Sequence, residues 1–137
     1  MPPFPQGNTY VQRCLLALVI SVVVGTRPEI IKIATIILDL QRGNVDFRIV
    51  HTGQHYDLES SQVFFLELGL PQADNLLEVG SGTQAYQTAM SLIKLGEVFI
   101  DEDPHLILVE GDTNTVPAGA LAGAKLGIDV GHVEAGL

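Results

Sequence analysis

Two carboxylates in the second half of the chain stand where acid–base chemistry is commonly placed. Asp112 follows the apolar run 106–109, and Glu134 follows a second apolar run that begins at Ile128. Each comes just after an expected buried strand, where partial loss of water would raise the pKa of a carboxyl group toward neutrality. The simpler alternative for Asp112 is that it caps the helix that follows.

A second set of residues near the start of the chain is typical of anion binding. The segment Gly25-Thr26-Arg27-Pro28-Glu29 ends the first apolar run, and Lys32 follows about one helical turn later. Gly25 permits a tight turn, and Pro28 suits the first turn of a helix. The N–H groups of that turn, with Arg27 and Lys32, would hold a phosphate group. An ordinary capped turn with solvated cations is the alternative. No G-x-G-x-x-G follows, so this is not a dinucleotide fingerprint.

Three histidines have interpretations other than metal binding or catalysis. His51 and His55 lie in one polar segment, but no third His or Cys stands nearby at ligand spacing, so we predict no metal site. We expect the loop with Gln54 and His55 to contact a base, a sugar or a neighbouring domain, with a solvent-exposed loop as the alternative. His132 is expected to point into the packing layer as a core histidine.

The elements that position these residues alternate between strands and helices. We expect strands at 14–24, 47–50, 76–79, 105–109 and from 128, and helices at 29–41, 58–68, 84–99 (after the N-cap Thr83) and 118–126. This alternation predicts an α/β fold, a Rossmann-like doubly wound parallel sheet with helices on both faces. Ligands of such sheets bind beyond the carboxyl ends of the strands, where strand order reverses. Arg27, Asp112 and Glu134 would then converge.

Composition narrows the class of protein. The 137 residues suit one domain, and 47% apolar residues suffice for a core. The net charge of −9 argues against a nucleic-acid partner. The run from Cys14 to Val24 is too short to cross a membrane, and no signal cleavage site follows it. Cys14 is the only cysteine, which suits the cytoplasm. We expect residues 1–13 to be a loose extension and 14–137 to be the domain.

Four segments together resemble the non-hydrolysing UDP-N-acetylglucosamine 2-epimerases. They stand in the family's order and spacing from about Val22 to the last residue, and the set is specific although each member alone is weak. The pattern 79–83 is similar to archaeal-type members. The segments are Gly25-Thr26-Arg27-Pro28-Glu29 with Ile31-Lys32, Thr52-Gly53-Gln54-His55, Gly111-Asp112-Thr113-Asn114-Thr115, and Gly131-His132-Val133-Glu134-Ala135-Gly136-Leu137.

The resemblance implies a fold of the GT-B type, of which this chain would be the N-terminal half. It implies interconversion of UDP-N-acetylglucosamine and UDP-N-acetylmannosamine for cell-surface polysaccharide synthesis. The C2 proton is removed, UDP is eliminated to give 2-acetamidoglucal, and UDP is added back, without a metal or other cofactor. By position, Asp112 and Glu134 would supply acid–base catalysis, with no assignment of the C2 base. The matched positions expected to bind the UDP-sugar are Arg27, Lys32, Gly25, Thr26, Gln54, His55 and Thr113.

The chain departs from the family's pattern in two respects. It ends at Leu137, before an Arg and the C-terminal nucleotide-binding domain that family members carry. We therefore expect it to be inactive alone, with that domain or its split-gene product as a partner, and a homodimer because family members are typically dimers. Gln54 matches part of an allosteric site of bacterial members, but Ser81-Gly82 lacks the basic residue expected there, so we expect no such activation.

Three rival functions remain at this stage. A GT-B glycosyltransferase would share the fold, but would transfer the sugar without exchange at C2. A hydrolysing epimerase would release free N-acetylmannosamine. A non-catalytic docking subunit of a split enzyme would bind its partner half without doing chemistry itself.

Overall fold

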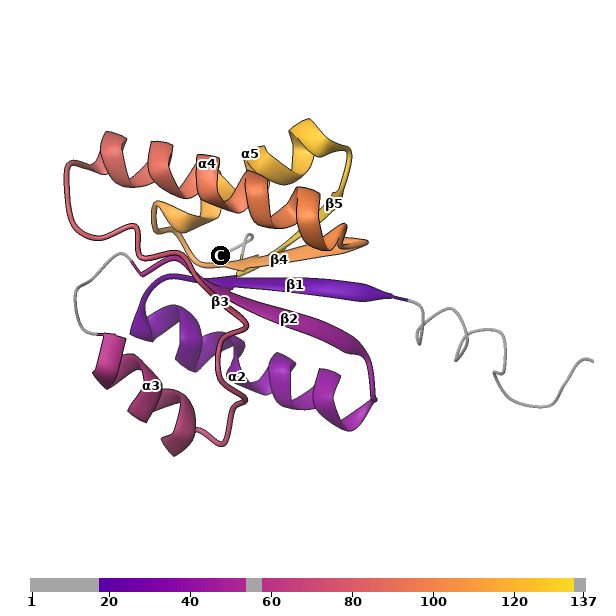
Figure 1. Ribbon diagram of the computed structural model, residues 1–137. Helices are drawn as coiled ribbons and strands as arrows, with labels where there is room; N and C mark the ends of the chain where they lie inside the picture. Colours follow the sequence, from indigo (N-terminus) through magenta and orange to yellow (C-terminus); the bar gives the residue numbers. More distant parts are fainter. Residues whose placement is uncertain (1–17, 54–57, 135–137) are drawn as a thin grey trace, which may run out of the picture.

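The computed structural model describes residues 18–53 and 58–134, with the side chains of 58–60 outside the description. Five parallel strands form one sheet in the order β3-β2-β1-β4-β5. Helices α2 and α3 cover one face, and α4 and α5 cover the other (Figure 1). The predicted doubly wound α/β fold is confirmed. The elements are β1 (Val19–Val24), α2 (Arg27–Arg42), β2 (Asp46–His51), α3 (Leu58–Glu67), β3 (Asn75–Leu76), α4 (Gln84–Glu102), β4 (Leu106–Glu110), α5 (Thr115–Leu126) and β5 (Asp129–Val133).

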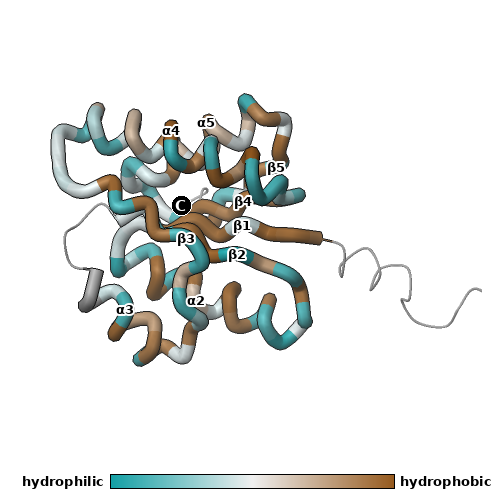
Figure 2. Tube along the Cα trace, in the orientation of Figure 1, coloured by the Kyte–Doolittle hydropathy of each residue, from teal (hydrophilic) through white to brown (hydrophobic). Residues whose placement is uncertain are grey.

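The central strand β1 shows why this sequence makes a sheet covered on both faces. Val22 and Val24 pack into the cluster under α2, whereas Val23 packs into the cluster under α4 and α5. Successive side chains of a strand point to opposite faces, so a strand buried on both sides must be mainly apolar. Figure 2 accordingly shows β1 as mostly hydrophobic, with Ser21 as the polar residue within it, while the helices alternate between hydrophilic and hydrophobic residues.

Helix α5 lies unusually close to the sheet because its inner face carries glycines. A Cβ atom on Gly123 would come within 2.7 Å of Val130 Cγ2 and 2.8 Å of Ile107 Cδ1. A side chain at this position would push the helix outward. The close approach fixes the C-terminal part of α5 against β4 and β5.

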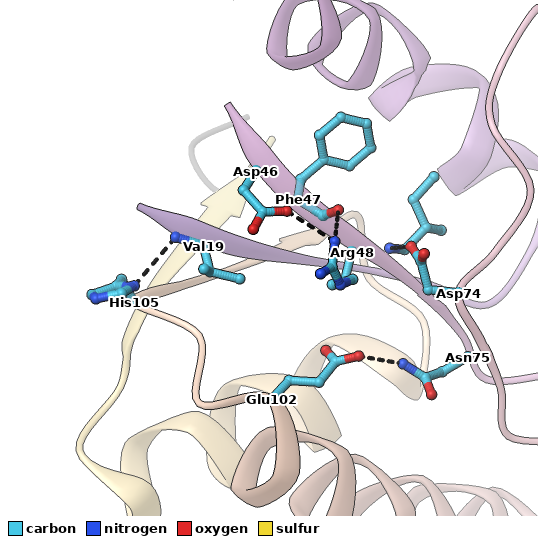
Figure 3. Close-up of polar contacts among 9 residues, drawn as sticks. Val19, Asp46, Phe47, Arg48, Asp74, Asn75, Glu102 and His105 are labelled. Carbon is cyan, nitrogen blue, oxygen red and sulfur yellow. Dashed lines mark hydrogen bonds and ion pairs between the residues drawn. The ribbon is translucent and has the colours of Figure 1, made fainter. Parts of the chain in front are cut away.

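Polar contacts hold the ends of strands in the sheet (Figure 3). Val19 N donates to His105 Nδ1 at 3.2 Å, and His105 N donates back to Val19 O at 2.8 Å. Asn75 Nδ2 donates to Glu102 Oε1 at 2.6 Å, which ties β3 to the end of α4. The Val19–His105 contact lies at the amino end of β1, whereas the contact of Asn75 lies at the strand that pairs with the carboxyl end of β2.

The predicted element boundaries need three corrections. β1 begins at Val19, and residues 14–17 of the predicted strand lie outside the described residues, as does the expected extension 1–13. β3 is only Asn75–Leu76 in place of 76–79, because Glu78 adopts a left-handed φ of 51° that breaks the strand. α5 begins at Thr115, three residues early, because Pro117 falls in its first turn, where no N–H is needed.

No described helix is long and apolar enough to cross a membrane.

Candidate functional site

The carboxyl ends of β1, β4 and β5 meet at one edge of the sheet. Strand order reverses between β1 and β4, which is the switch point of this fold. Glu110, the last residue of β4, pairs with Val133 of β5, so Glu134 follows directly beside it. The strands that precede Arg27, Asp112 and Glu134 are therefore neighbours, as predicted.

Glu29 closes the turn between β1 and α2. The residue is 2% exposed, and its carboxylate accepts the backbone N–H groups of Gly25 at 2.6 Å and Thr26 at 3.2 Å. The Thr113 hydroxyl donates to the same carboxylate from the loop after β4. Burial raises the pKa of Glu29, against the lowering effect of these three hydrogen bonds. The acid three residues after an N-cap Thr is a known sequence signature that could have identified this role.

This arrangement corrects the predicted anion cradle. We expected the N–H groups of the Gly25 turn to be free for a phosphate, but two of them are already bound by Glu29. The cations of the segment do stay near the surface. The Arg27 guanidinium lies 5.8 Å from the centre of the Phe64 ring, and the Lys32 side chain is 49% exposed.

Lys32 and Glu134 form the main charged contact of the site. Lys32 Nζ donates to Glu134 Oε2 at 2.7 Å, across 102 residues of sequence. Glu134 has a left-handed φ of 63°, which is uncommon for a residue other than glycine.

Glu110 lies behind this ion pair and was not among the predicted site residues. Its side chain is 1% exposed, and its Oε1 is 3.8 Å from Lys32 Nζ. Burial, and then its interaction with Glu134, raises the pKa of Glu110 to about 7. The pKa of Glu134 is lowered, first by the hydrogen bond from Lys32 and then by Glu110. The sequence did contain a signal for Glu110, because it is a glutamate at the end of an otherwise aliphatic strand.

Asp112 differs from the prediction in its surroundings. Its residue is exposed, so the expected burial of this carboxylate is wrong. The alternative, that Asp112 caps the following helix, is also wrong, because the N-cap of α5 is Asn114. The reason is Gly111, whose φ of 82° turns the chain away from the core after Glu110. Asp112 remains at the same edge of the sheet, facing solvent.

Three further residues were considered in the sequence, and only one of them lies among the described residues. Gln54 and His55 lie outside the described residues. His132 is exposed, and its Nε2 is 2.7 Å from Gly111 O, so its expected place in the core is wrong. This contact ties the His132 side chain of β5 to the backbone of the loop that follows β4. Across residues 18–53 and 58–134, no group of three His, Cys, Asp or Glu side chains could hold a metal ion.

A cavity of about 360 Å³ lies elsewhere, between α3 and the β2–β3 edge, and is lined in part by His51 and Phe65. Burial lowers the pKa of His51, and its Nδ1 accepts the N–H of Gly53 at 2.9 Å. The ring is therefore a neutral packing group. This cavity does not adjoin the carboxylates, whose edge is formed by β1, β4 and β5.

Comparison with known proteins identifies the family. The family model described as UDP-N-acetylglucosamine 2-epimerase matches residues 39–137. The chain belongs to the UDP-N-acetylglucosamine 2-epimerase family. The predicted resemblance is confirmed, and the epimerase family is an isomerase family.

Individual relatives agree with this assignment. The chain is 51% identical over 118 residues to a UDP-N-acetylglucosamine 2-epimerase of Methanocaldococcus jannaschii, covering 86% of this chain and 32% of the relative. A Pseudomonas aeruginosa protein named UDP-2,3-diacetamido-2,3-dideoxy-D-glucuronate 2-epimerase is 40% identical over 119 residues, covering 86% of this chain and 34% of the relative.

A crystal structure of the M. jannaschii epimerase in complex with UDP-GlcNAc and UDP matches with a TM-score of 0.83 and 50% identity. The match covers 88% of this chain and 33% of that one. The chain thus spans about a third of the length of the epimerases that it matches.

Proposed function

We propose that this chain is the N-terminal, Rossmann-like half of an enzyme that interconverts UDP-N-acetylglucosamine and UDP-N-acetylmannosamine in the cytoplasm. The observation that carries the proposal is the meeting of Lys32, Glu110 and Glu134 where β1, β4 and β5 end, in a chain of this family. The relative with the TM-score of 0.83 was crystallised with UDP-GlcNAc and UDP, which supports a UDP-sugar ligand.

Asp112 and Glu134 supply the acid–base chemistry in this proposal. Removal of the C2 proton needs a base held close to the sugar, and loss of UDP needs its developing charge to be stabilised. Glu134 is a held but accessible carboxylate, with its side chain 33% exposed. Asp112 faces solvent from the adjacent loop. Thr113 contributes indirectly in this proposal. Its hydroxyl donates a hydrogen bond to Glu29, whose contacts hold the turn between β1 and α2.

Lys32 and Arg27 bind the diphosphate in this proposal, with Gln54 and His55 near the sugar or base. Lys32 is bound to Glu134 in the absence of a ligand. A diphosphate that draws Lys32 away removes the largest influence that lowers the pKa of Glu134, and so makes Glu134 a stronger base. Substrate binding and activation of the base are then linked through one lysine.

A C-terminal nucleotide-binding domain, on the same polypeptide or on a separate chain, supplies the other side of the active site in this proposal. One face of a sheet edge cannot exclude water from a reactive intermediate. We also propose a homodimer, which the molar mass in solution tests directly.

The test follows the C2 position of UDP-N-acetylglucosamine by proton NMR in heavy water. One sample contains this chain alone, and a second contains the chain fused to the C-terminal two thirds of the M. jannaschii relative. Deuterium at C2 with formation of UDP-N-acetylmannosamine is expected in the fused protein and not in the chain alone. We expect Asp112→Asn and Glu134→Gln each to reduce exchange by about 100-fold or more.

Other outcomes decide between the rivals. Exchange by the chain alone would contradict the need for a second domain. Transfer of the sugar without C2 exchange would support a glycosyltransferase, and free N-acetylmannosamine would indicate a hydrolysing enzyme. Because one relative carries the name of a diacetamido-glucuronate epimerase, that UDP-sugar is tested alongside. A folded fusion that exchanges neither substrate would refute the proposal.

A further inference from the structure

Glu110 is a buried carboxyl group that neither the predicted acid–base pair nor the diphosphate site uses. Its Oε1 is fully buried and has no hydrogen-bond partner among the described residues. Lys32 Nζ, at 3.8 Å, is beyond hydrogen-bond distance and is bound instead to Glu134. An ionised oxygen left in this state would lose its hydration without compensation, which strongly disfavours the charged form.

The charges around Glu110 make its ionisation still less favourable. Glu134, which directly follows β5, and Glu29, on α2, both act on Glu110 to raise its pKa. Lys32, also on α2, is the one cation among the described groups that act on it. Glu110 and Glu134 share Lys32 as a neighbour, at 3.8 Å and 2.7 Å from its Nζ. Two carboxyl groups placed this close cannot both ionise readily, and one of them must carry a proton in order to donate a hydrogen bond to the other.

Burial decides which of the two carries the proton. The Glu110 side chain is 1% exposed and the Glu134 side chain is 33% exposed. Glu134 also has the ion pair with Lys32, at 2.7 Å. The charge therefore belongs on Glu134 and the proton on Glu110.

We infer that Glu110 is a positioning residue for Glu134, whose buried carboxyl group holds a proton and donates it in a hydrogen bond that keeps Glu134 ionised and oriented. The role of Glu134 in catalysis rests on the proposed function, whereas the state of the carboxyl pair does not. The pKa values of the two groups are consequently driven apart, which is typical of carboxyl pairs with divided roles.

The test is a ¹³C NMR titration of glutamate carboxyl groups in this chain, which needs no UDP-sugar. Wild type is compared with Glu110→Gln, which keeps a hydrogen-bond donor but cannot ionise, and with Glu110→Ala, which loses the donor. Glu134→Gln and Glu29→Gln assign the signals of those two residues, and amide spectra verify that each variant is folded.

We expect one wild-type carboxyl group to titrate near pH 7 and to vanish in both Glu110 variants. The pKa of Glu134 should stay low in Glu110→Gln and rise in Glu110→Ala, a rescue by the amide that simple packing would not give. Titration of Glu110 near the ordinary value of 4.5 would overturn the inference. An unchanged pKa of Glu134 in folded Glu110→Ala would also overturn it. Should Glu110→Ala not fold, loss of the low Glu134 pKa in Glu110→Gln would overturn it instead.

The titration and the exchange assay test the two proposals independently. A titration as expected with no C2 exchange in any form would refute the proposed function and leave the carboxyl pair intact. C2 exchange with no glutamate titrating near neutrality would refute the role of Glu110 and leave the epimerase proposal standing.

Discussion

The two sides of the candidate site are held by different kinds of interaction. On the β1–α2 side, Glu29 binds two backbone N–H groups and the Thr113 hydroxyl inside the protein. On the β4–β5 side, Glu134 is held by Lys32 and by Glu110 near the surface. The first side is fixed by hydrogen bonds to the backbone, which keep one geometry. The second depends on charges and protons, so it can respond to pH and to a ligand. A rigid turn thus stands beside a cluster of charges that can respond to its surroundings.

The largest effect on stability is expected from a substitution on the β1–α2 side. Glu29→Ala leaves the N–H groups of Gly25 and Thr26 without their acceptor in a buried turn. We expect a loss of about 3 kcal/mol in the free energy of unfolding, measured by urea denaturation. Glu29→Gln keeps an acceptor oxygen and should lose less than about 1 kcal/mol. Equal losses in the two variants would show that the hydrogen bonds to the turn are not what matters.

The β4–β5 side, which contains Glu110, should make the stability of the protein depend on pH. The pKa of Glu110 is raised from 4.5 to about 7 in the folded state. The folded protein therefore binds more protons than the unfolded chain between these values, and stability is lost as pH rises through them. We expect wild type to lose up to roughly 3 kcal/mol from this group between pH 4.5 and 8, and Glu110→Gln not to lose it.

The matched control for this prediction is Glu97→Gln, at an exposed position on α4. Its pH profile should follow that of wild type. The contribution of neutral, buried His51 is common to all three proteins and cancels in the comparison. Parallel profiles for wild type and Glu110→Gln would contradict a protonated Glu110.

The link between the two sides is tested at Thr113. Thr113→Val removes the hydroxyl that donates to Glu29 but keeps the shape of the side chain. We expect a loss of about 1 kcal/mol in the free energy of unfolding. Thr113→Ser retains the hydroxyl and should lie closer to wild type. A Val variant as stable as wild type would mean that the two sides are not coupled through this contact.

The smallest effect on stability is expected at Lys32, whose side chain is half exposed. Lys32→Met should change unfolding little, because solvent screens exposed ion pairs. It should instead raise the pKa of Glu134, since the lysine is the main cause of its lowering. A ¹³C carboxyl titration measures this shift, and Lys32→Arg serves as the charged control. No change in the Glu134 pKa would remove the basis for linking diphosphate binding to activation of the base.

Much of the fold could be predicted because it depends on local patterns. The apolar run of β1 and the helical periodicity of α4 are properties of neighbouring residues, and both elements formed as expected. The predictions failed at β3 and at the start of α5, where a single left-handed Glu78 and a proline in the first turn shifted the ends. Boundaries depend on such individual backbone choices, which periodicity does not record.

The candidate site was predicted in its location but not in its chemistry. Strand–helix alternation predicted a doubly wound sheet, in which Arg27, Asp112 and Glu134 were expected to follow neighbouring strands, and the observed strand order places them so. Four short segments in order indicated the family. The burial of Glu110 near Glu134, the exposure of Asp112 and the contacts of Glu29 with the predicted anion turn became visible only in the folded structure. The reason is physical: the pKa and partners of a carboxyl group depend on burial and on charges a few ångströms away, and Lys32 and Glu134 are 102 residues apart in the chain.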